Sequence, residues 1–99
     1  MDDGTLSERL EMLLVLMWLD DGSPPDGAVA LSVATAAAEL DAGAGREGLL
    51  AVMTALGELE ERGAVEVAWP RGHGREARVS LASPLRRDAE RLFGTREAG

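Results

Sequence analysis

Apolar residues recur at three- and four-residue steps along much of the chain, which is the spacing of a buried helix face. The first such stretch follows a capping box formed by Thr5 and Glu8, and another ends at Gly63, a residue type typical of helix C-termini. The pair Ser83 and Pro84 suits a helix start. The pattern predicts four helices, over about residues 6–19, 33–40, 46–62 and 84–93.

Between these helices lie shorter stretches typical of strands. Residues 28–31 are apolar and follow a loop, residues 20–27, that is rich in Gly and Pro. Residues 64–82 alternate between apolar and polar positions on either side of a Gly-rich tip, which predicts a hairpin. We therefore predict an α+β fold, mainly α, with a three-helix core, an antiparallel sheet of two or three strands and a closing C-terminal helix.

The size of the chain allows one hydrophobic core. A length of 99 residues is enough for one domain but leaves two halves near the limit of independent folding, so residues 1–99 are expected to be a single domain. The longest apolar run, residues 12–19, is far shorter than the roughly 20 residues that cross a bilayer. Asp2 and Asp3 replace the basic flank of a signal peptide, so we expect a cytoplasmic protein without membrane partners.

Several residue types are missing, which excludes whole classes of chemistry. The chain has no Cys, Lys, Ile, Asn, Gln or Tyr, a bias that indicates a GC-rich bacterial genome. Disulfides, thiolate metal sites, lysine Schiff bases and P-loops are therefore excluded. Residues 43–48 match the glycine spacing of a dinucleotide site, but they follow a helix rather than a strand, and His73 is the only histidine. We expect no enzyme activity, no cofactor and no metal.

Charge is distributed unevenly along the chain. The formal net charge is −8, made up of −11 over residues 1–66 and +3 over residues 67–99. Because a polyanion responds to the local potential, the basic C-terminal third is where a phosphate backbone would bind.

Two segments carry a resemblance to a known family. They are Leu56-x-x-Leu59-Glu-Glu-Arg-Gly63-Ala-Val65-Glu-Val67 and Arg71-Gly-His-Gly-Arg75-Glu-Ala-Arg78-Val-Ser-Leu81. With the order of elements, they resemble the winged helix-turn-helix domain of small bacterial transcriptional regulators of the MarR, PadR and ArsR types, over about residues 6–93. The resemblance implies a dimeric regulator that binds double-stranded DNA through the helix over residues 46–62 and through the hairpin, which is the wing.

The resemblance also implies which residues contact DNA. Arg46 and Thr54 would read base edges in the major groove. The residues that would bind phosphates or enter the minor groove are Arg71, His73, Arg75 and Arg78. The alternative for the hairpin is a solvated surface in which Arg78 pairs with Glu66. In the last helix, the arginines 86, 87 and 91 are expected to form a solvated face with Asp88 and Glu90.

The helix over residues 46–62 has a poor face for reading DNA. We expect its buried side to be Leu49, Leu50, Met53, Leu56 and Leu59. The side left for solvent is Arg46, Glu47, Gly48, Ala51, Thr54, Ala55, Gly57 and Glu58. Since this side is small and acidic, an alternative function is a winged-helix module that binds a protein partner on this helix and does not bind DNA.

The first helix carries more apolar residues than one buried face needs. We expect the surplus, together with the end of the last helix, to form a homodimer interface. The interface residues predicted are Met12, Val15, Trp18, Leu19, Leu92 and Phe93. The alternative is that the last helix and the strands of the same chain cover them.

Overall fold

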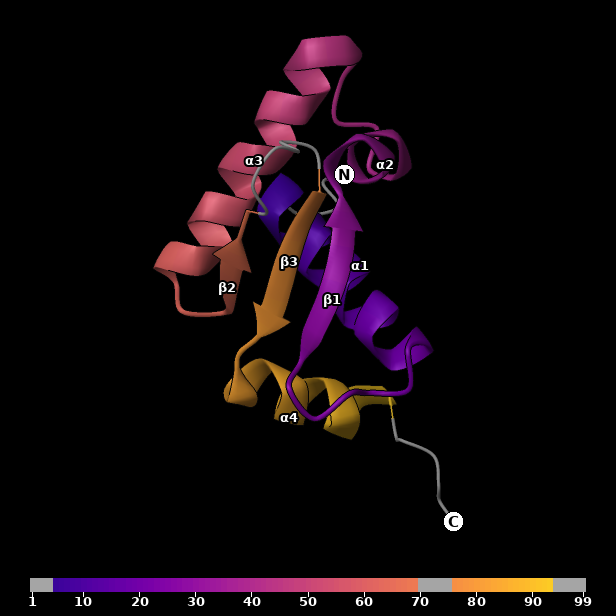
Figure 1. Ribbon diagram of the computed structural model, residues 1–99, viewed down its shortest axis with the longest axis vertical. Helices are drawn as coiled ribbons and strands as arrows, with labels where there is room; N and C mark the ends of the chain where they lie inside the picture. Colours follow the sequence, from indigo (N-terminus) through magenta and orange to yellow (C-terminus); the bar gives the residue numbers. More distant parts are fainter. Residues whose placement is uncertain (1–4, 70–75, 94–99) are drawn as a thin grey trace.

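The computed structural model describes residues 5–69 and 76–93. Within these ranges the chain forms four helices and three strands (Figure 1). They are α1 (Leu6–Asp20), β1 (Ala28–Ser32), α2 (Val33–Glu39), α3 (Gly45–Glu61), β2 (Val65–Ala68), β3 (Glu76–Leu81) and α4 (Ser83–Phe93). The fold class predicted, α+β and mainly α, is confirmed at this level, and each helix begins and ends within one residue of its expected bounds.

The helix ends follow from local residue chemistry. At the start of α1, the Glu8 amide donates to the Thr5 hydroxyl at 3.2 Å and the Thr5 amide donates to the Glu8 carboxylate at 3.1 Å, which is the predicted capping box. At the end of α3, Gly63 has a φ of 79°, a left-handed conformation that turns the chain into β2. The Ala64 amide then donates to the Leu59 carbonyl at 3.0 Å.

The three strands form one antiparallel sheet in the order β1-β3-β2, so β3 is the central strand. Val79 of β3 lies opposite Val29 of β1 and Val67 of β2. Along β3 the side chains alternate between the core and solvent, with Ala77, Val79 and Leu81 buried. The sheet thus has one buried face and one face exposed to solvent.

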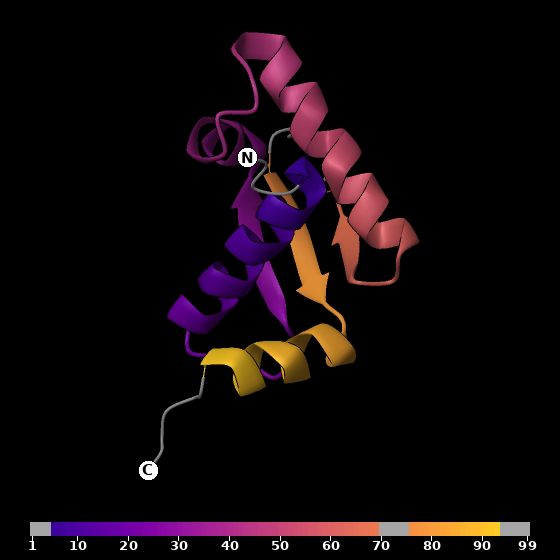
Figure 2. The ribbon, with the colours of Figure 1, turned by 180° about the vertical axis from the view of Figure 1, so that it is seen from behind.

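The buried face of the sheet is covered by helices. Figure 2 shows α1 and α3 side by side on this face, with α4 across the end at which β3 finishes. Figure 1 looks onto the opposite face, which none of the described helices covers. The largest side chains in the core are those of Trp18, Leu10, Leu14, Leu31, Leu56 and Leu59.

Two residues predicted at a dimer interface belong to this core instead. Trp18 is only 1% exposed and its indole Nε1–H donates to the Pro24 carbonyl at 2.8 Å, so the loop after α1 folds over it. Val15 is also buried. Their apolar surface is covered by the chain itself, which is the alternative that the sequence left open, so neither side chain is available to a second copy.

Candidate recognition surface

Helix α3 has one side in the core and the other in solvent. Small residues at close contacts determine which side is buried. Its buried residues are Gly48, Val52, Ala55, Leu56 and Leu59. Gly48 is required by the close approach of the chain before α3, because a Cβ atom there would lie 2.3 Å from the Gly43 carbonyl oxygen. The expectation that Gly48 and Ala55 face solvent is therefore wrong.

The exposed side of α3 carries two large apolar residues. Leu50 is 54% exposed and Met53 is 39% exposed, although both were expected in the core. With Gly48, Val52 and Leu56 turned inward, the 100° step between helix residues leaves Leu50 and Met53 on the outer side. Because Leu49 and Leu50 are adjacent, they cannot both lie at the centre of one buried face, but their adjacency does not indicate which of them faces solvent.

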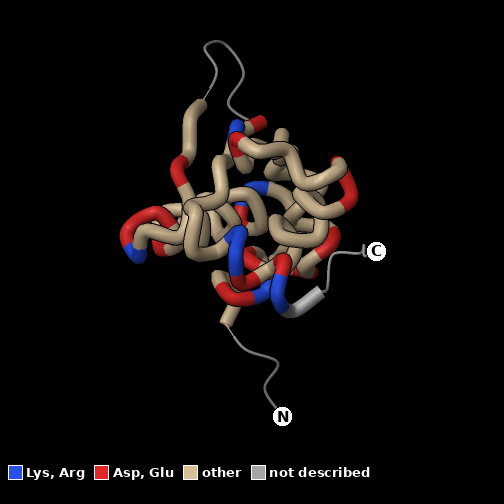
Figure 3. The backbone as a smooth tube through the Cα atoms, turned by 90° about the horizontal axis from the view of Figure 1, so that it is seen from below, with Lys and Arg blue, Asp and Glu red and all other residues tan. Residues whose placement is uncertain are grey.

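Charged residues surround this apolar pair. Glu47, Glu58 and Glu61 are exposed on α3, and none forms an ion pair with another described residue. Arg46 is exposed in the first turn. Figure 3 shows acidic positions spread around the described chain and fewer basic ones between them. We call the exposed side of α3, residues Arg46, Glu47, Leu50, Met53, Thr54, Glu58 and Glu61, the α3 surface.

A groove adjoins the α3 surface at its N-terminal end. It has a volume of about 510 Å³ and lies between α2 and the start of α3. Its walls include Ala34, Ala37 and Ala38 of α2 and Arg46 and Leu49 of α3. The groove enlarges the area over which a partner could contact α3.

The residues proposed to contact DNA fall in different places. Arg46 and Thr54 are both exposed on α3, about 12 Å apart along the helix. Arg78 lies on the solvent face of the sheet, where its guanidinium is 3.7 Å from the Asp26 carboxylate. It does not pair with Glu66, because the register places Glu66 opposite Ser80. Arg71, His73 and Arg75 lie outside the described residues.

Two arginines of α4, Arg86 and Arg91, make contacts within the chain, while Arg87 is exposed. Arg91 pairs with Asp88 at 2.5 Å, as expected for a solvated helix face. Arg86 instead donates to the Pro25 carbonyl and, at 2.9 Å, to the Ser83 hydroxyl, so it connects α4 to the loop before β1. This bracing role had no signal in the sequence because Pro25 and Arg86 are far apart in the chain.

The outer side of α1 retains part of the predicted dimer surface. Met12 and Leu16 are each 46% exposed and Leu19 is half-buried. Leu16 was not among the predicted interface residues, although it lies one turn from Met12. The side chains of Leu92 and Phe93 lie outside the described part of the structure.

Among the described residues, no group of three or more Asp, Glu or His residues is placed to hold a metal ion. None of the helices in the described ranges has the length and apolar character needed to cross a membrane.

Comparison of the chain with protein families, with curated proteins and with solved structures gives no match.

Proposed function

We propose that this chain is a winged-helix module that binds a protein partner through the α3 surface. The order of elements along the chain, with β3 between β1 and β2, is compatible with a winged helix. On this assignment α3 corresponds to the recognition helix and β2 and β3 to the wing. The assignment gives α3 the position from which such domains contact their partners.

The observation that carries this proposal is the chemistry of the α3 surface. Leu50 and Met53 expose apolar area that a partner would bury, at about 25 cal/mol per Å². Glu47, Glu58 and Glu61 would repel DNA phosphates, which supply most of the affinity of a DNA-binding helix. The same acids would attract lysines or arginines around an apolar patch, so the partner is expected to be a protein segment with apolar residues at its centre and basic residues at its rim.

The test compares two apolar surfaces of the same size. The variant Leu50→Gln/Met53→Gln changes the α3 surface, and Met12→Gln/Leu16→Gln changes the outer side of α1 as a matched control. Each protein is immobilised, and bound proteins are captured from a lysate of a GC-rich bacterium and identified by mass spectrometry. We expect a partner that the α1 control retains and the α3 variant loses. Equal capture by both variants would refute the proposal.

A second candidate function is a DNA-binding regulator. It is favoured by the exposure of Arg46 and Thr54 on α3 and by the basic composition of residues 71–78. Fluorescence anisotropy with generic duplex DNA at low and physiological salt tests it, with Arg71→Ala/Arg75→Ala for comparison. Binding that weakens with salt and is lost in this variant would favour the regulator. The absence of binding at low salt would favour the protein-binding module.

Homodimer formation is a related proposal. The apolar residues on the outer side of α1, Met12 and Leu16, support it because they expose area that a second copy would cover. Sedimentation equilibrium over a range of concentrations tests it. A dimer that Met12→Gln/Leu16→Gln dissociates would support the interface, and a wild-type monomer at high concentration would contradict it.

A further inference from the structure

The outer edge of β1 offers backbone groups that no strand of the described ranges pairs. The Leu81 amide donates to the Gly27 carbonyl at 2.9 Å, which fixes the alternation of hydrogen bonds between β3 and β1. In the observed register, Val29 and Leu31 then direct their N–H and C=O groups at β3, and Ala30 directs both of its groups outward. None of the described residues bonds the N–H or C=O of Ala30.

The other edge of the sheet is different. In β2, the outward N–H of Val67 donates to the Glu60 carboxylate at 3.4 Å, so a side chain of α3 blocks that edge at this amide. At β1 the contact that residues 5–69 and 76–93 provide lies at one end, where the Asp26 carboxylate accepts from the Ala28 amide at 3.0 Å. Natural sheets commonly block an unused edge. Within the described part of the chain, the edge of β1 is therefore open at Ala30.

A groove lies directly beside this open edge. It has a volume of about 370 Å³ and is bounded by α1, β1 and α2. Leu13 and Met17 of α1 form its apolar floor and are only half-buried, and Thr35 and Glu39 of α2 also line it. Since α1 covers the buried face of the sheet, this floor lies where the inward side chains of a strand added next to β1 would pack.

We infer that β1 and this groove bind an extended peptide of a partner protein as a fourth strand of the sheet. The N–H and C=O of Ala30 would pair with the peptide backbone, and one apolar side chain of the peptide would rest on Leu13 and Met17. This site is separate from the α3 surface and does not depend on the proposed function.

The charges at the groove favour a basic peptide over a second copy of this chain. Glu39 at the groove is exposed and has no ion-pair partner in the described ranges, so a basic residue of the peptide would complement it. A second copy would have to present its own β1, Ala28–Ser32, which contains no cation, and would bring together two chains of net charge −8. The occupant is therefore an extended peptide with an apolar residue for the groove and a basic residue beside Glu39, rather than a second copy.

The experiment titrates the ¹⁵N-labelled protein with the synthetic peptide Ac-Lys-Val-Lys-Val-Lys-Val-Lys-NH₂ and follows amide chemical shifts by NMR. We expect saturable shifts at Ala30, Ser32 and the residues of α1 that line the groove. Ala30→Pro removes the outward N–H without removing a bond to β3, so the variant keeps the fold and should bind at least about tenfold more weakly.

Two further measurements separate the alternatives. Glu39→Lys should weaken binding of this peptide and favour a version with Glu in place of Lys, whereas Leu50→Gln/Met53→Gln should leave binding unchanged. No shifts at Ala30 with millimolar peptide would overturn the inference, as would peptide binding that Ala30→Pro leaves intact. Self-association without peptide that Ala30→Pro abolishes would also overturn it, because the occupant would then be a second copy.

Discussion

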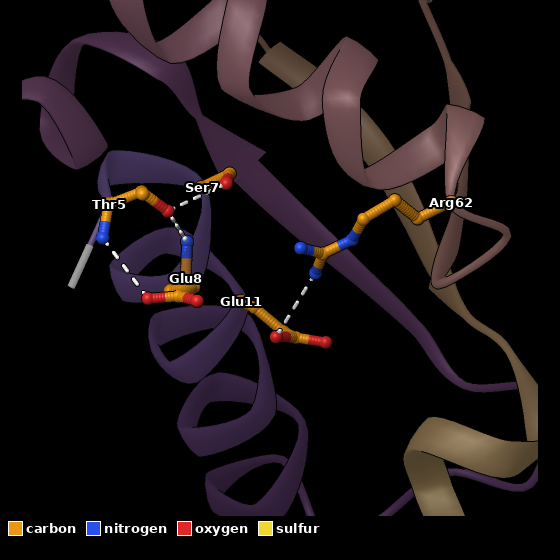
Figure 4. Close-up of polar contacts among 5 residues, drawn as sticks. All are labelled: Thr5, Ser7, Glu8, Glu11 and Arg62. Atoms are coloured by element: carbon orange, nitrogen blue, oxygen red, sulfur yellow. Dashed lines mark hydrogen bonds and ion pairs between the residues drawn. The ribbon is translucent and has the colours of Figure 1, made fainter.

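The two long helices, α1 and α3, use their polar side chains in different ways. On α1, Glu11 pairs with Arg62 at 3.4 Å, and Thr5 and Glu8 make the capping contacts (Figure 4). Arg9 of the same helix donates to the Leu40 carbonyl at 2.6 Å. On the α3 surface, the exposed acids form no ion pair with the described residues. The polar residues of α1 thus stabilise the fold, whereas the exposed acids of the α3 surface make no such contact with the described residues.

The largest effect that would sharpen this comparison is expected at Trp18 of α1. Trp18→Ala would remove a buried ring and its bond to Pro24, and we expect a loss of about 3–5 kcal/mol in the free energy of unfolding. Trp69, which is 41% exposed, is the matched control, and Trp69→Ala should cost much less. Urea denaturation monitored by circular dichroism measures both. Similar losses in the two variants would show that Trp18 is not the core residue described.

Substitutions at two glycines of α3 compare its buried side with its exposed side. Gly48→Ala would force a Cβ atom against the Gly43 carbonyl and should destabilise the fold by about 1–3 kcal/mol. At Gly57 a Cβ atom would meet no atom within 4 Å, so Gly57→Ala should stabilise the helix by about 0.5–1 kcal/mol. The midpoints of urea denaturation give both values. If both substitutions stabilise, the close approach at Gly48 is refuted.

A pair of arginines compares the two helices directly. Arg9→Ala would leave the Leu40 carbonyl at the end of α2 without its donor, and we expect a cost of about 1 kcal/mol. Arg46 on the α3 surface has no such bond to a described residue, so Arg46→Ala should change stability by less than about 0.5 kcal/mol. Thermal denaturation of the two variants checks this difference. A larger loss of stability in Arg46→Ala than in Arg9→Ala would show that Arg46, and not Arg9, makes the stabilising contact.

The smallest effect is expected from the ion pair between the helices. Glu11 and Arg62 are partly exposed, so their coupling should be about 0.2–1 kcal/mol and should decrease as salt is added. A double-mutant cycle with Glu11→Gln and Arg62→Met, measured at low and high salt, gives the coupling free energy. A coupling free energy of zero at low salt would show that this ion pair does not stabilise the fold.

Local chemistry explains why the helices and strands could be predicted. Thr5, Glu8 and Gly63 act through bonds to residues within a few positions, so the ends of α1 and α3 can be read from short sequence windows. The two-residue alternation of β3 likewise depends only on which side of a single sheet is buried.

Which side of each helix is buried depends on contacts between residues that are distant in the sequence, so it was harder to predict. Trp18 is buried because the loop at Pro24 folds over it, and Gly48 is buried because the chain at Gly43 approaches α3. Neither contact leaves a periodic signal. The candidate site depends on the exposure of Leu50 and Met53, which follows from that packing. The helical period alone does not determine how α3 is rotated about its axis, and so does not determine which residues face solvent.

The central position of β3 has a consequence for the order of folding. Val29 pairs with Val79, fifty residues later in the sequence, whereas β2 and β3 are neighbours along the chain. During synthesis, α1, β1, α2 and α3 leave the ribosome before the strand that joins β1 to β2. Once residues 76–81 have emerged, β2 and β3 can pair quickly because they are neighbours in the sequence. The slow step is expected to be the docking of β1, since long-range pairing closes a large loop. Until residues 76–81 emerge, the sheet cannot close over α1, and a nascent chain would expose apolar side chains to chaperones.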